Sequence, residues 1–340
     1  MSASLSRDAA SRYNLPAMDH TDPWRSVAET LLGAPTLTPL EVARESGTDP
    51  DEARRLWRAL GFPPVADDER IFTPSDVAIL REVRAVLEVD VASREDLLQI
   101  TRVIGQALAR VADAQVTASA TRLEHALRER GADALDANAI AERVAQLAPR
   151  LEQFLAYVWR RHLLASLRSR AARPAEGDRA LAVGFADLVG FTSLSQALEP
   201  RELAVAVDRF EAIAYEHVPE HGGRVVKTIG DEVMFAAEDG VAAAEIALSL
   251  ADAYHREKNL PGVRVGLAWG PVLSWEGDLY GPTVNLASRL VNLAHANSVL
   301  VSDAMGATLQ GAPGFELLHL RAVRLQGIGR ARSWVLRRAR

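Results

Sequence analysis

The spacing of apolar residues changes near residue 175, and the patterns before and after this point are typical of two different fold classes. Before it, the chain is rich in Ala, Leu, Arg and Glu and has few strand-like runs. Its apolar residues recur every three or four positions, which is typical of amphipathic helices. The helices predicted in this way include 76–87, 94–130 and 139–170. Pro149 predicts a kink or break in the third, because proline removes a backbone donor from a helix.

After residue 178 the sequence alternates between strand and helix patterns. The predicted strands cover 180–186, 224–229, 232–237, 263–273 (interrupted at 269–271) and 298–302. The predicted helices cover 200–217, 240–255 and 283–294. The order β-α-β-β-α-β is that of the ferredoxin-like fold, an α+β arrangement that here carries additions. In this fold the first strand lies beside the second strand of the hairpin, so residues at their ends come together.

Segment 171–178 separates the two patterns. It loses the helical periodicity and contains Pro and Gly, as linkers do. We therefore expect an all-helical domain over 1–170, a linker over 171–178 and an α+β domain over 179–340. A chain of 340 residues is comfortable for two domains, and 48% hydrophobic residues suffice for two cores.

The composition argues against several classes of function. The formal net charge of −6 argues against a large nucleic-acid footprint, because such surfaces are basic. The chain has no cysteine, which excludes disulfides, thiolate metal sites and a cysteine nucleophile. Its N-terminus lacks a signal-peptide pattern, and no apolar run is long enough to cross a bilayer. We expect a soluble, cytoplasmic protein without a membrane span.

Two aspartates stand where predicted strands end. Asp187 closes the first apolar strand, and Asp231 lies in a Gly-Asp turn between the two strands of the hairpin. If the strands are neighbours, the two carboxylates converge. Hard divalent cations such as Mg²⁺ take carboxylate oxygens and leave further positions to water and substrate phosphates. The pair therefore predicts a divalent-cation site for phosphate chemistry, in which two ions activate the attacking oxygen and stabilise the leaving one.

A third stretch, 278–290, adds groups suited to a nucleotide. Asn285 and Arg289 are four residues apart, so they point the same way on a helix. An amide and a guanidinium on one face suit a ribose oxygen and a phosphate, and arginine can bind phosphate through two hydrogen bonds at once. Lys227 and Asp278 supply a donor and an acceptor for the edge of a purine base.

These stretches together resemble the catalytic domain of class III nucleotidyl cyclases. The resemblance extends from about residue 180 to 337 and rests on three motifs in the family's order. They are F-x-D-L-V-G-F-T from Phe185, K-T-I-G-D-E-V-M-F from Lys227 and G-x-x-V-N-x-A-S-R from Gly281. Three motifs at the usual separations are far more specific than any one of them.

The resemblance implies a reaction and a substrate. Asp187 and Asp231 match the family's metal ligands, which hold two Mg²⁺ or Mn²⁺ ions per site. Lys227 and Asp278 match the adenine-selecting pair, since guanylyl cyclases typically have Glu and Cys there. The implied reaction is attack of the ribose 3′-oxygen of ATP on its α-phosphorus, which yields 3′,5′-cyclic AMP and pyrophosphate.

In this family the site lies between two catalytic domains. One domain contributes the metal aspartates, and the other contributes the base-binding pair with Asn285 and Arg289. Asn285 matches the residue that orients the ribose, and Arg289 matches the one that stabilises charge on the α-phosphate. This chain carries both sets, so the resemblance implies a head-to-tail homodimer with two equivalent sites and an inactive monomer.

One position departs from the family pattern. Near the C-terminus the family often has a phosphate-binding lysine where this chain has Gln326. The residues that would replace it are Arg324, Arg330 and Arg332.

Each site residue also has an ordinary structural explanation. The two aspartates can be a turn former and a helix cap. The Asn-Arg pair can form a solvated helix face, Lys227 can protect an edge strand, and Asp278 can be a loop residue. The chain would lack the predicted site only if all of these explanations held at once. In that case the alternative function is a DNA-binding or signalling scaffold with a degenerate cyclase domain.

Part of the N-terminal half, residues 35–75, resembles the winged helix-turn-helix of MerR-type regulators. It predicts a helix, a tight turn and a second helix, followed by a short wing over 67–73. The second helix of such a motif enters the major groove. Here three acidic residues at its start would repel phosphates, so we favour a protein-interaction or sensor module. These residues are Asp49, Asp51 and Glu52.

The remaining helices up to Arg170 resemble the all-helical regulatory domains attached to some actinobacterial cyclases. The resemblance implies that domain 1–170 sets how two catalytic domains meet, in response to pH or to a small molecule or lipid. His125 and His162 are the histidines that would titrate near neutrality. A long apolar helix pair is more often simply part of a core.

Overall fold

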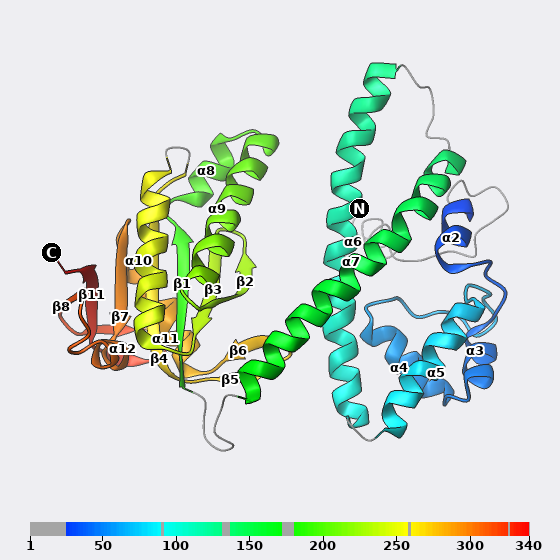
Figure 1. Cartoon of the computed structure of the whole chain (residues 1–340), viewed down its shortest axis with the longest axis horizontal. Helices are drawn as coiled ribbons and strands as arrows, with labels where there is room; N and C mark the ends of the chain where they lie inside the picture. Colours follow the sequence, from blue (N-terminus) through cyan, green and yellow to red (C-terminus); the bar gives the residue numbers. More distant parts are fainter. Residues whose placement is uncertain are drawn as a thin grey trace, which may run out of the picture. The chain divides into compact units, whose positions relative to one another are not determined.

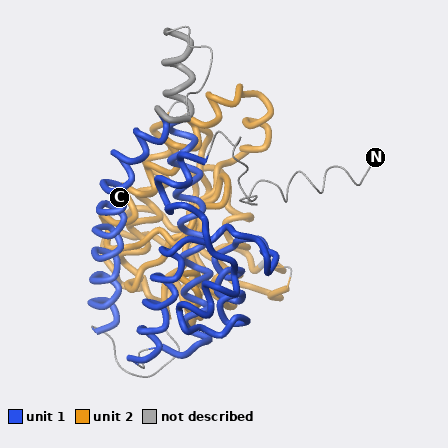
Figure 2. Tube along the Cα trace, turned by 90° about the vertical axis from the view of Figure 1, so that its right-hand side faces the viewer, with its two compact units in different colours: residues 1–173 blue, residues 174–340 orange. Residues whose placement is uncertain are grey.

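The computed structural model describes residues 25–89, 92–130, 137–171, 180–257, 260–325 and 327–339, apart from the side chains of 120–130, 137–139 and Val323. The chain divides into two compact units, residues 1–173 and 174–340 (Figure 2). Each unit has a hydrophobic core of its own, as independent domains do.

Helices form the framework of the first unit within its described residues. Their order is α2 (Arg25–Leu32), α3 (Pro39–Ser46), α4 (Pro50–Ala59), α5 (Pro74–Glu88), α6 (Arg94–Arg130) and α7 (Ala137–Ala171). Helix α3 packs on α4 and α5, α4 packs on α6, and α2 packs on α7 (Figure 1). A small core of Val42, Phe72 and Val77 lies among the shorter helices. The prediction of an all-α arrangement for this half is confirmed.

Side-chain caps fix where the short helices begin. The Thr38 hydroxyl accepts a hydrogen bond from the Glu41 N–H at 3.2 Å, and the Glu41 carboxylate accepts one from the Thr38 N–H at 2.9 Å. Thr73 and Asp76 form the same reciprocal box at the start of α5. Such boxes satisfy backbone donors that the first helical turn leaves free. Gly47, at φ 71°, ends α3 in a conformation that favours glycine.

Two local predictions for this half differ from the structure. No break occurs at Pro149, because helix α7 runs through it; good helix formers on both sides outweigh the loss of one backbone hydrogen bond. The predicted wing over 67–73 forms no hairpin. Instead, the Leu37 and Phe72 backbones exchange hydrogen bonds of 2.9 and 3.1 Å in an isolated bridge.

The second unit is built on a seven-stranded sheet of order β2-β3-β1-β4-β7-β11-β8 (Figure 1). The strands are β1 (Ala180–Leu188), β2 (Arg224–Ile229), β3 (Glu232–Ala237), β4 (Val263–Pro271), β7 (Ser298–Ser302), β8 (Phe315–His319) and β11 (Ser333–Arg338). Strands β2, β3, β1 and β4 pair antiparallel, in the ferredoxin-like order. The predicted fold class is therefore confirmed, and β7, β11 and β8 are its additions.

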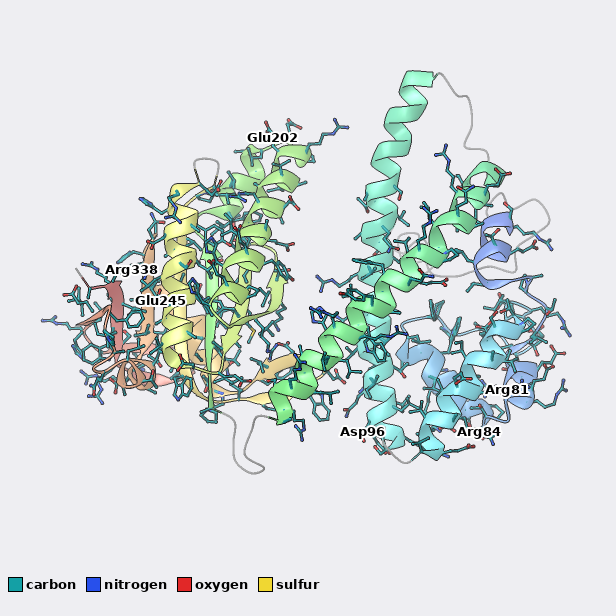
Figure 3. The ribbon with its side chains drawn as sticks, viewed as in Figure 1. Arg81, Arg84, Asp96, Glu202, Glu245 and Arg338 are labelled. Atoms are coloured by element: carbon teal, nitrogen blue, oxygen red, sulfur yellow. The ribbon has the colours of Figure 1, made fainter. Side chains whose placement is uncertain are left out.

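Helices cover both faces of this sheet. They are α8 (Phe191–Ala197), α9 (Pro200–Glu220), α10 (Gly240–Arg256), α11 (Pro282–Leu293) and α12 (Asp303–Thr308). Helices α9 and α10 share the larger core with one face, and α11 packs on the other (Figure 1). Arg338 of β11 reaches Glu245 of α10 at 2.8 Å, which ties the added strands to the core helices (Figure 3).

Two short hairpins lie outside the main sheet: β5 (Leu273–Trp275) pairs with β6 (Asp278–Tyr280), and β9 (Val323–Leu325) pairs with β10 (Gly329–Ala331). The strand predicted over 263–273 is therefore too long. Strand β4 passes through 269–271 without interruption because β1 pairs with it as far as Pro271. It ends there, and Leu273 belongs to β5.

Candidate active site

Asp187 lies near the end of β1, in the interior of the sheet. Its register partners are Glu232 on β3 and Arg264 on β4. Directly opposite residues of neighbouring strands project from the same face. By the alternation along β1, this is the face of Phe185, which shares a core with α11. The three side chains therefore form a charged row on the α11 face of the sheet.

Asp187 is 9% exposed, and its Oδ2 accepts a hydrogen bond from Arg264 Nε at 2.5 Å. Burial raises the pKa of Asp187, the Arg264 guanidinium opposes the rise, and the nearby Asp231 carboxylate adds to it. Removing a carboxylate from water costs free energy unless a cation compensates. Within this chain, the Arg264 guanidinium is the cation that directly compensates the buried Asp187 carboxylate.

Asp231 follows Gly230 in the turn of the β2–β3 hairpin, where Gly230 has φ 62°. Its carbonyl oxygen accepts a hydrogen bond from the Leu188 N–H at 3.1 Å. The hairpin turn is thereby fixed to the residue that follows Asp187. The ferredoxin-like order thus brings the two aspartates together, and their role as metal ligands stays a prediction.

Sequence reasoning missed Glu232 and Arg264. Burial, first of all, and the nearby Asp187 and Asp231 carboxylates raise the pKa of Glu232 to about 7, against the opposing charges of Arg264 and Lys227. The signal for both residues was the strand register. Glu232 opens the strand predicted beside the first one, and Arg264 lies near the start of the strand predicted over 263–273, so both fall opposite Asp187 only after pairing is known.

The donor set of this cluster fits a divalent cation. Asp187 and Asp231 offer the hard carboxylate oxygens that Mg²⁺ and Mn²⁺ prefer, and their mutual repulsion is offset only in part by Arg264. In the part of the chain that the structure describes, no three His, Asp or Glu side chains form a complete cage for a metal ion. A bound ion would therefore keep positions for water and for substrate oxygens, as Mg²⁺ usually does.

Lys227 and Asp278 form an ion pair between β2 and the β5–β6 hairpin. Both side chains are only partly exposed, at 36% and 21%. Lys227 lies opposite Met234, which belongs to the α11-side core, so the pair lies on the same face as Asp187. The donor and acceptor that the sequence predicts for a purine edge are thus adjacent.

Asn285 and Arg289 lie on the exposed side of α11. Among the described residues, neither side chain has a hydrogen-bond or ion-pair partner, so both are available to a ligand or to a second chain. The opposite side of α11 packs closely on β4 at Gly266. A Cβ on Gly266 would lie 2.2 Å from the Val291 nitrogen and 2.5 Å from the Ala287 carbonyl oxygen. This glycine sets how near α11 approaches the sheet.

The structure narrows the choice among the three arginines that are candidates to bind phosphate near the C-terminus. Gln326 lies outside the described residues. Arg324 and Arg330 are register partners in the β9–β10 hairpin. Arg332 is engaged elsewhere, because its guanidinium forms an ion pair with Asp303 at 2.8 Å. Arg324 and Arg330 therefore remain the candidates to replace the family lysine.

The fold and the site together define a class of protein: a ferredoxin-like domain that gathers two neighbouring aspartates and a Lys-Asp ion pair at one end of its sheet. Comparison with protein families specifies it further. The model for the adenylate and guanylate cyclase catalytic domain matches residues 174–338, and the adenylate cyclase regulatory domain model matches residues 21–167. The chain belongs to the adenylate and guanylate cyclase family, as its three motifs predict.

Relatives with known names match both units. The chain is 38% identical over 305 residues to an adenylate cyclase of Streptomyces coelicolor, with 86% of this chain and 78% of the relative covered. It is 38% identical over 304 residues to an adenylate cyclase of Streptomyces griseus, with 86% and 75% covered. It is 30% identical over 312 residues to a pH-sensitive adenylate cyclase of Mycobacterium tuberculosis, with 88% and 77% covered.

Among solved structures, the guanylate cyclase domain of RhGC from Catenaria anguillulae in complex with GTP aligns with a TM-score of 0.45 and 21% identity, covering 49% of this chain and 100% of that domain. None of the helices in the described part of the chain is long and apolar enough to span a membrane.

Proposed function

We propose that this chain is an adenylate cyclase that converts ATP into 3′,5′-cyclic AMP and pyrophosphate. The observation that carries the proposal is the pairing of Lys227 with Asp278 on the sheet face that also holds Asp187, with Asp231 in the turn beside it. Two of the relatives described above are adenylate cyclases that share 38% of aligned residues with this chain across both units.

Base selection follows from hydrogen-bonding chemistry. Adenine presents an amino donor next to a ring-nitrogen acceptor. The Asp278 carboxylate accepts from the amino group, and the Lys227 ammonium donates to the ring nitrogen. Guanine presents a carbonyl acceptor and a protonated ring nitrogen at these positions, so it would leave both protein groups mismatched.

The chain's own residues then divide the work on the sugar and phosphates. Asp187 and Asp231 hold two divalent ions, and Arg264 keeps the Asp187 carboxylate in place. When bound, the ions supply Lewis-acid activation of the 3′-oxygen and charge stabilisation on the phosphates. Asn285 orients the ribose by hydrogen bonding, and Arg289 offsets the charge that develops at the α-phosphate.

The complete site needs two copies of the chain, arranged head to tail. The exposure of Asn285 and Arg289 supports this, because they have no partner among the described residues of their own chain. The β5–β6 hairpin beside Asp278 also exposes large apolar side chains, which soluble monomers rarely cluster. These side chains are Leu273, Trp275 and Tyr280.

We further propose that the helical unit regulates how two catalytic units meet. It contains an apolar cavity of about 300 Å³ lined in part by Trp57, Phe62 and Phe72, with Arg58 among its lining residues. Such a cavity suits the apolar tail and acidic head of a lipid regulator.

A DNA-binding role is the weaker alternative for this unit. Asp49 caps α4 by accepting from the Asp51 and Glu52 N–H groups, so the end of α4 that would enter a groove is acidic. Arg54, the first basic residue after them, is paired with Asp51 and Asp67 at 2.9 and 2.8 Å. A phosphate backbone would have to displace these pairs.

The deciding experiment incubates the purified chain with ATP and Mn²⁺ or Mg²⁺ and measures cyclic AMP. Formation of cyclic AMP by the native chain, but not by Asp187→Asn, is the expected result. If a chain that is dimeric by sedimentation makes no cyclic AMP with either metal, the proposed activity is wrong. A salt-sensitive and sequence-specific gel shift would then favour the scaffold alternative.

A further inference from the structure

Arg264 donates hydrogen bonds to two different parts of the candidate site. Its Nε donates to Asp187 Oδ2 at 2.5 Å, and its Nη1 donates to the Asn292 carbonyl oxygen at 3.4 Å. Asp187 belongs to the aspartate pair, whereas Asn292 lies in the last turn of α11, the helix that carries Asn285 and Arg289. One guanidinium therefore joins the two sets of site residues within a single chain.

The bond to Asn292 caps the C-terminal end of α11. Carbonyl groups in the last turn of a helix lack partners within the helix, and together they carry a partial negative charge. The Leu290 and Val291 carbonyl oxygens accept from the Ala294 N–H, and the last turn contains no basic residue of its own. Arg264 supplies a cation to this end from strand β4, and a cation in that place stabilises the helix.

The two bonds of Arg264 are unequal. A hydrogen bond from a cation to a carboxylate is shorter than a neutral one and roughly twice as strong. The 2.5 Å bond to Asp187 agrees with this, while the 3.4 Å bond to Asn292 is longer than the usual limit of about 3.2 Å for an N–H···O bond. The charge on Asp187 therefore sets the position of the guanidinium, and the cap on α11 is stretched.

Less charge on Asp187 would change this balance. When Asp187 and Asp231 bind a divalent cation, the carboxylate attracts the guanidinium less strongly, and the guanidinium is repelled by the ion. Glu232 is no alternative acceptor, because Asp187 on β1 lies between Glu232 on β3 and Arg264 on β4. The end of α11 is the acceptor that the guanidinium already contacts, so the cap becomes shorter.

We propose that Arg264 is a positioning residue for α11, whose guanidinium shifts part of its hydrogen bonding from Asp187 to Asn292 when Asp187 binds a divalent cation. Arg289 precedes Asn292 by three residues, which is less than one helical turn, so a firmer cap also fixes the backbone of Arg289. The inference rests on the proposed function in one respect: in a head-to-tail dimer, Asp187 and α11 of one chain serve different sites. Metal binding in one site then prepares Arg289 for the other, which couples the two sites.

Hydrogen exchange of backbone amides tests the shift in the full chain without ATP. Mass spectrometry follows a peptide that covers residues 289–296 with and without saturating Mn²⁺. We expect Mn²⁺ to slow exchange there about two- to fivefold, the effect of a cation at a helix end. Helix α10, which packs on the other face of the sheet, is the internal reference. Equal slowing in α10, or no slowing at 289–296 in chain saturated with Mn²⁺, would overturn the inference.

Two variants test the role of Arg264 without any metal. Asp187→Asn removes the carboxylate charge and keeps the shape of the side chain, so the last turn of α11 should exchange as slowly as in the Mn²⁺-bound native chain. Adding Arg264→Gln to this variant should abolish the protection, because the cap itself is gone. Exchange as fast as in the metal-free native chain for Asp187→Asn alone, or protection that survives in the double variant, would show that Arg264 does not act on α11.

A matched control separates this role from a general loss of stability. Arg321→Gln removes an exposed arginine of the same unit and should retain the full response to Mn²⁺. Arg264→Gln should lose that response, with electron paramagnetic resonance to measure bound Mn²⁺ in each variant. A response of native size in Arg264→Gln would contradict the proposed coupling.

These results are distinguishable from a failure of the proposed function, because exchange is measured without substrate. A native chain that makes no cyclic AMP, but whose last turn of α11 responds to Mn²⁺ and to Asp187→Asn, would contradict the proposed function alone. A chain that makes cyclic AMP, but whose last turn responds to neither, would contradict the role of Arg264 alone.

Discussion

Asp187 and Arg264 are joined in two ways. They are register partners on the neighbouring strands β1 and β4, and the Arg264 guanidinium donates from Nε to Asp187 Oδ2 at 2.5 Å. Strand pairing fixes the two backbones, so the guanidinium holds the carboxylate in one orientation. Arg264 is thus a positioning residue for the aspartate that is expected to bind a metal ion.

Removing this arginine tests that role. Arg264→Gln leaves a buried carboxylate beside Asp231 and Glu232 without its cation. Breaking a fully buried pair costs about 3–5 kcal/mol. Because the Arg264 side chain is 29% exposed, we expect the free energy of unfolding to fall by about 2 kcal/mol. Urea denaturation measures the change, and the exposed Arg321→Gln serves as the control. Equal losses in the two variants would refute the role.

Gly266 is expected to tolerate no side chain. In Gly266→Ala the new Cβ meets the backbone of Val291 and Ala287 rather than a flexible side chain, so α11 has to move away from β4. We expect a loss of about 1–3 kcal/mol in stability and a larger proportional loss of cyclic AMP synthesis, because Asn285 and Arg289 move with the helix. Thermal unfolding and initial rates measure the two effects. A variant with native rates would show that α11 can shift without consequence.

The ion pair between Lys227 and Asp278 predicts how base preference changes. Lys227→Glu with Asp278→Cys replaces donor and acceptor by the residue types that guanylyl cyclases typically carry. We expect kcat/KM for ATP to fall by about 10²-fold or more and that for GTP to rise. Lys227→Met alone is the control that removes the donor without adding an acceptor, so it should weaken ATP use without promoting GTP. Unchanged selectivity in the double variant would remove this pair from base recognition.

Mixed dimers test whether the site is shared. Asp187→Ala and Arg289→Ala each disable both sites of a homodimer, because each removes one half from every site. Mixing the two chains creates heterodimers with one intact site, so random pairing restores about a quarter of native activity. The assay is cyclic AMP synthesis after mixing, with mass spectrometry to confirm heterodimers. Heterodimers that stay inactive would contradict a shared site.

Glu41 makes the stability of the helical unit depend on pH. The Thr38 backbone N–H lowers the pKa of Glu41 below its usual 4.5, and the Arg70 guanidinium lowers it further. A lowered folded-state pKa stabilises the fold above the unfolded value, and this contribution is lost as pH falls through the folded value. We therefore expect the melting temperature of the native chain to fall more steeply below about pH 4.5 than that of Glu41→Gln. Glu82→Gln, on an exposed side chain, should retain the native slope. Identical slopes for native chain and Glu41→Gln would refute the prediction.

The sequence predicts most of the fold of the second unit because its periodicities are clean. The hairpin strands 224–229 and 232–237 agree with β2 and β3 to the residue. They are bounded by glycine-rich turns, which mark strand ends clearly. The errors occur where pairing rather than composition decides an end. Strand β4 stops at Pro271 because β1 stops pairing there, whereas the Gly-Pro pair at 270–271 predicts only an interruption of a longer strand.

The sequence predicts a residue of the candidate site only where that residue lies in a motif or close to one. Six residues follow from sequence because each lies in a motif or next to one. Glu232 and Arg264 do not, since their place beside Asp187 depends on which residues face each other across strands. Strand register is a long-range property, and a shift by one residue would move each side chain to the opposite face.

The position of each half-site in the sheet has a consequence for how such enzymes diversify. Asp187 lies on an interior strand that is paired on both sides, whereas Lys227 lies on the outermost strand and Asp278 on a small hairpin outside the sheet. On the proposed function, substitutions at this periphery would alter which base fits and leave the strands that gather the carboxylates undisturbed. A lineage could then exchange one nucleotide for another in a few steps while the proposed metal site stays constant.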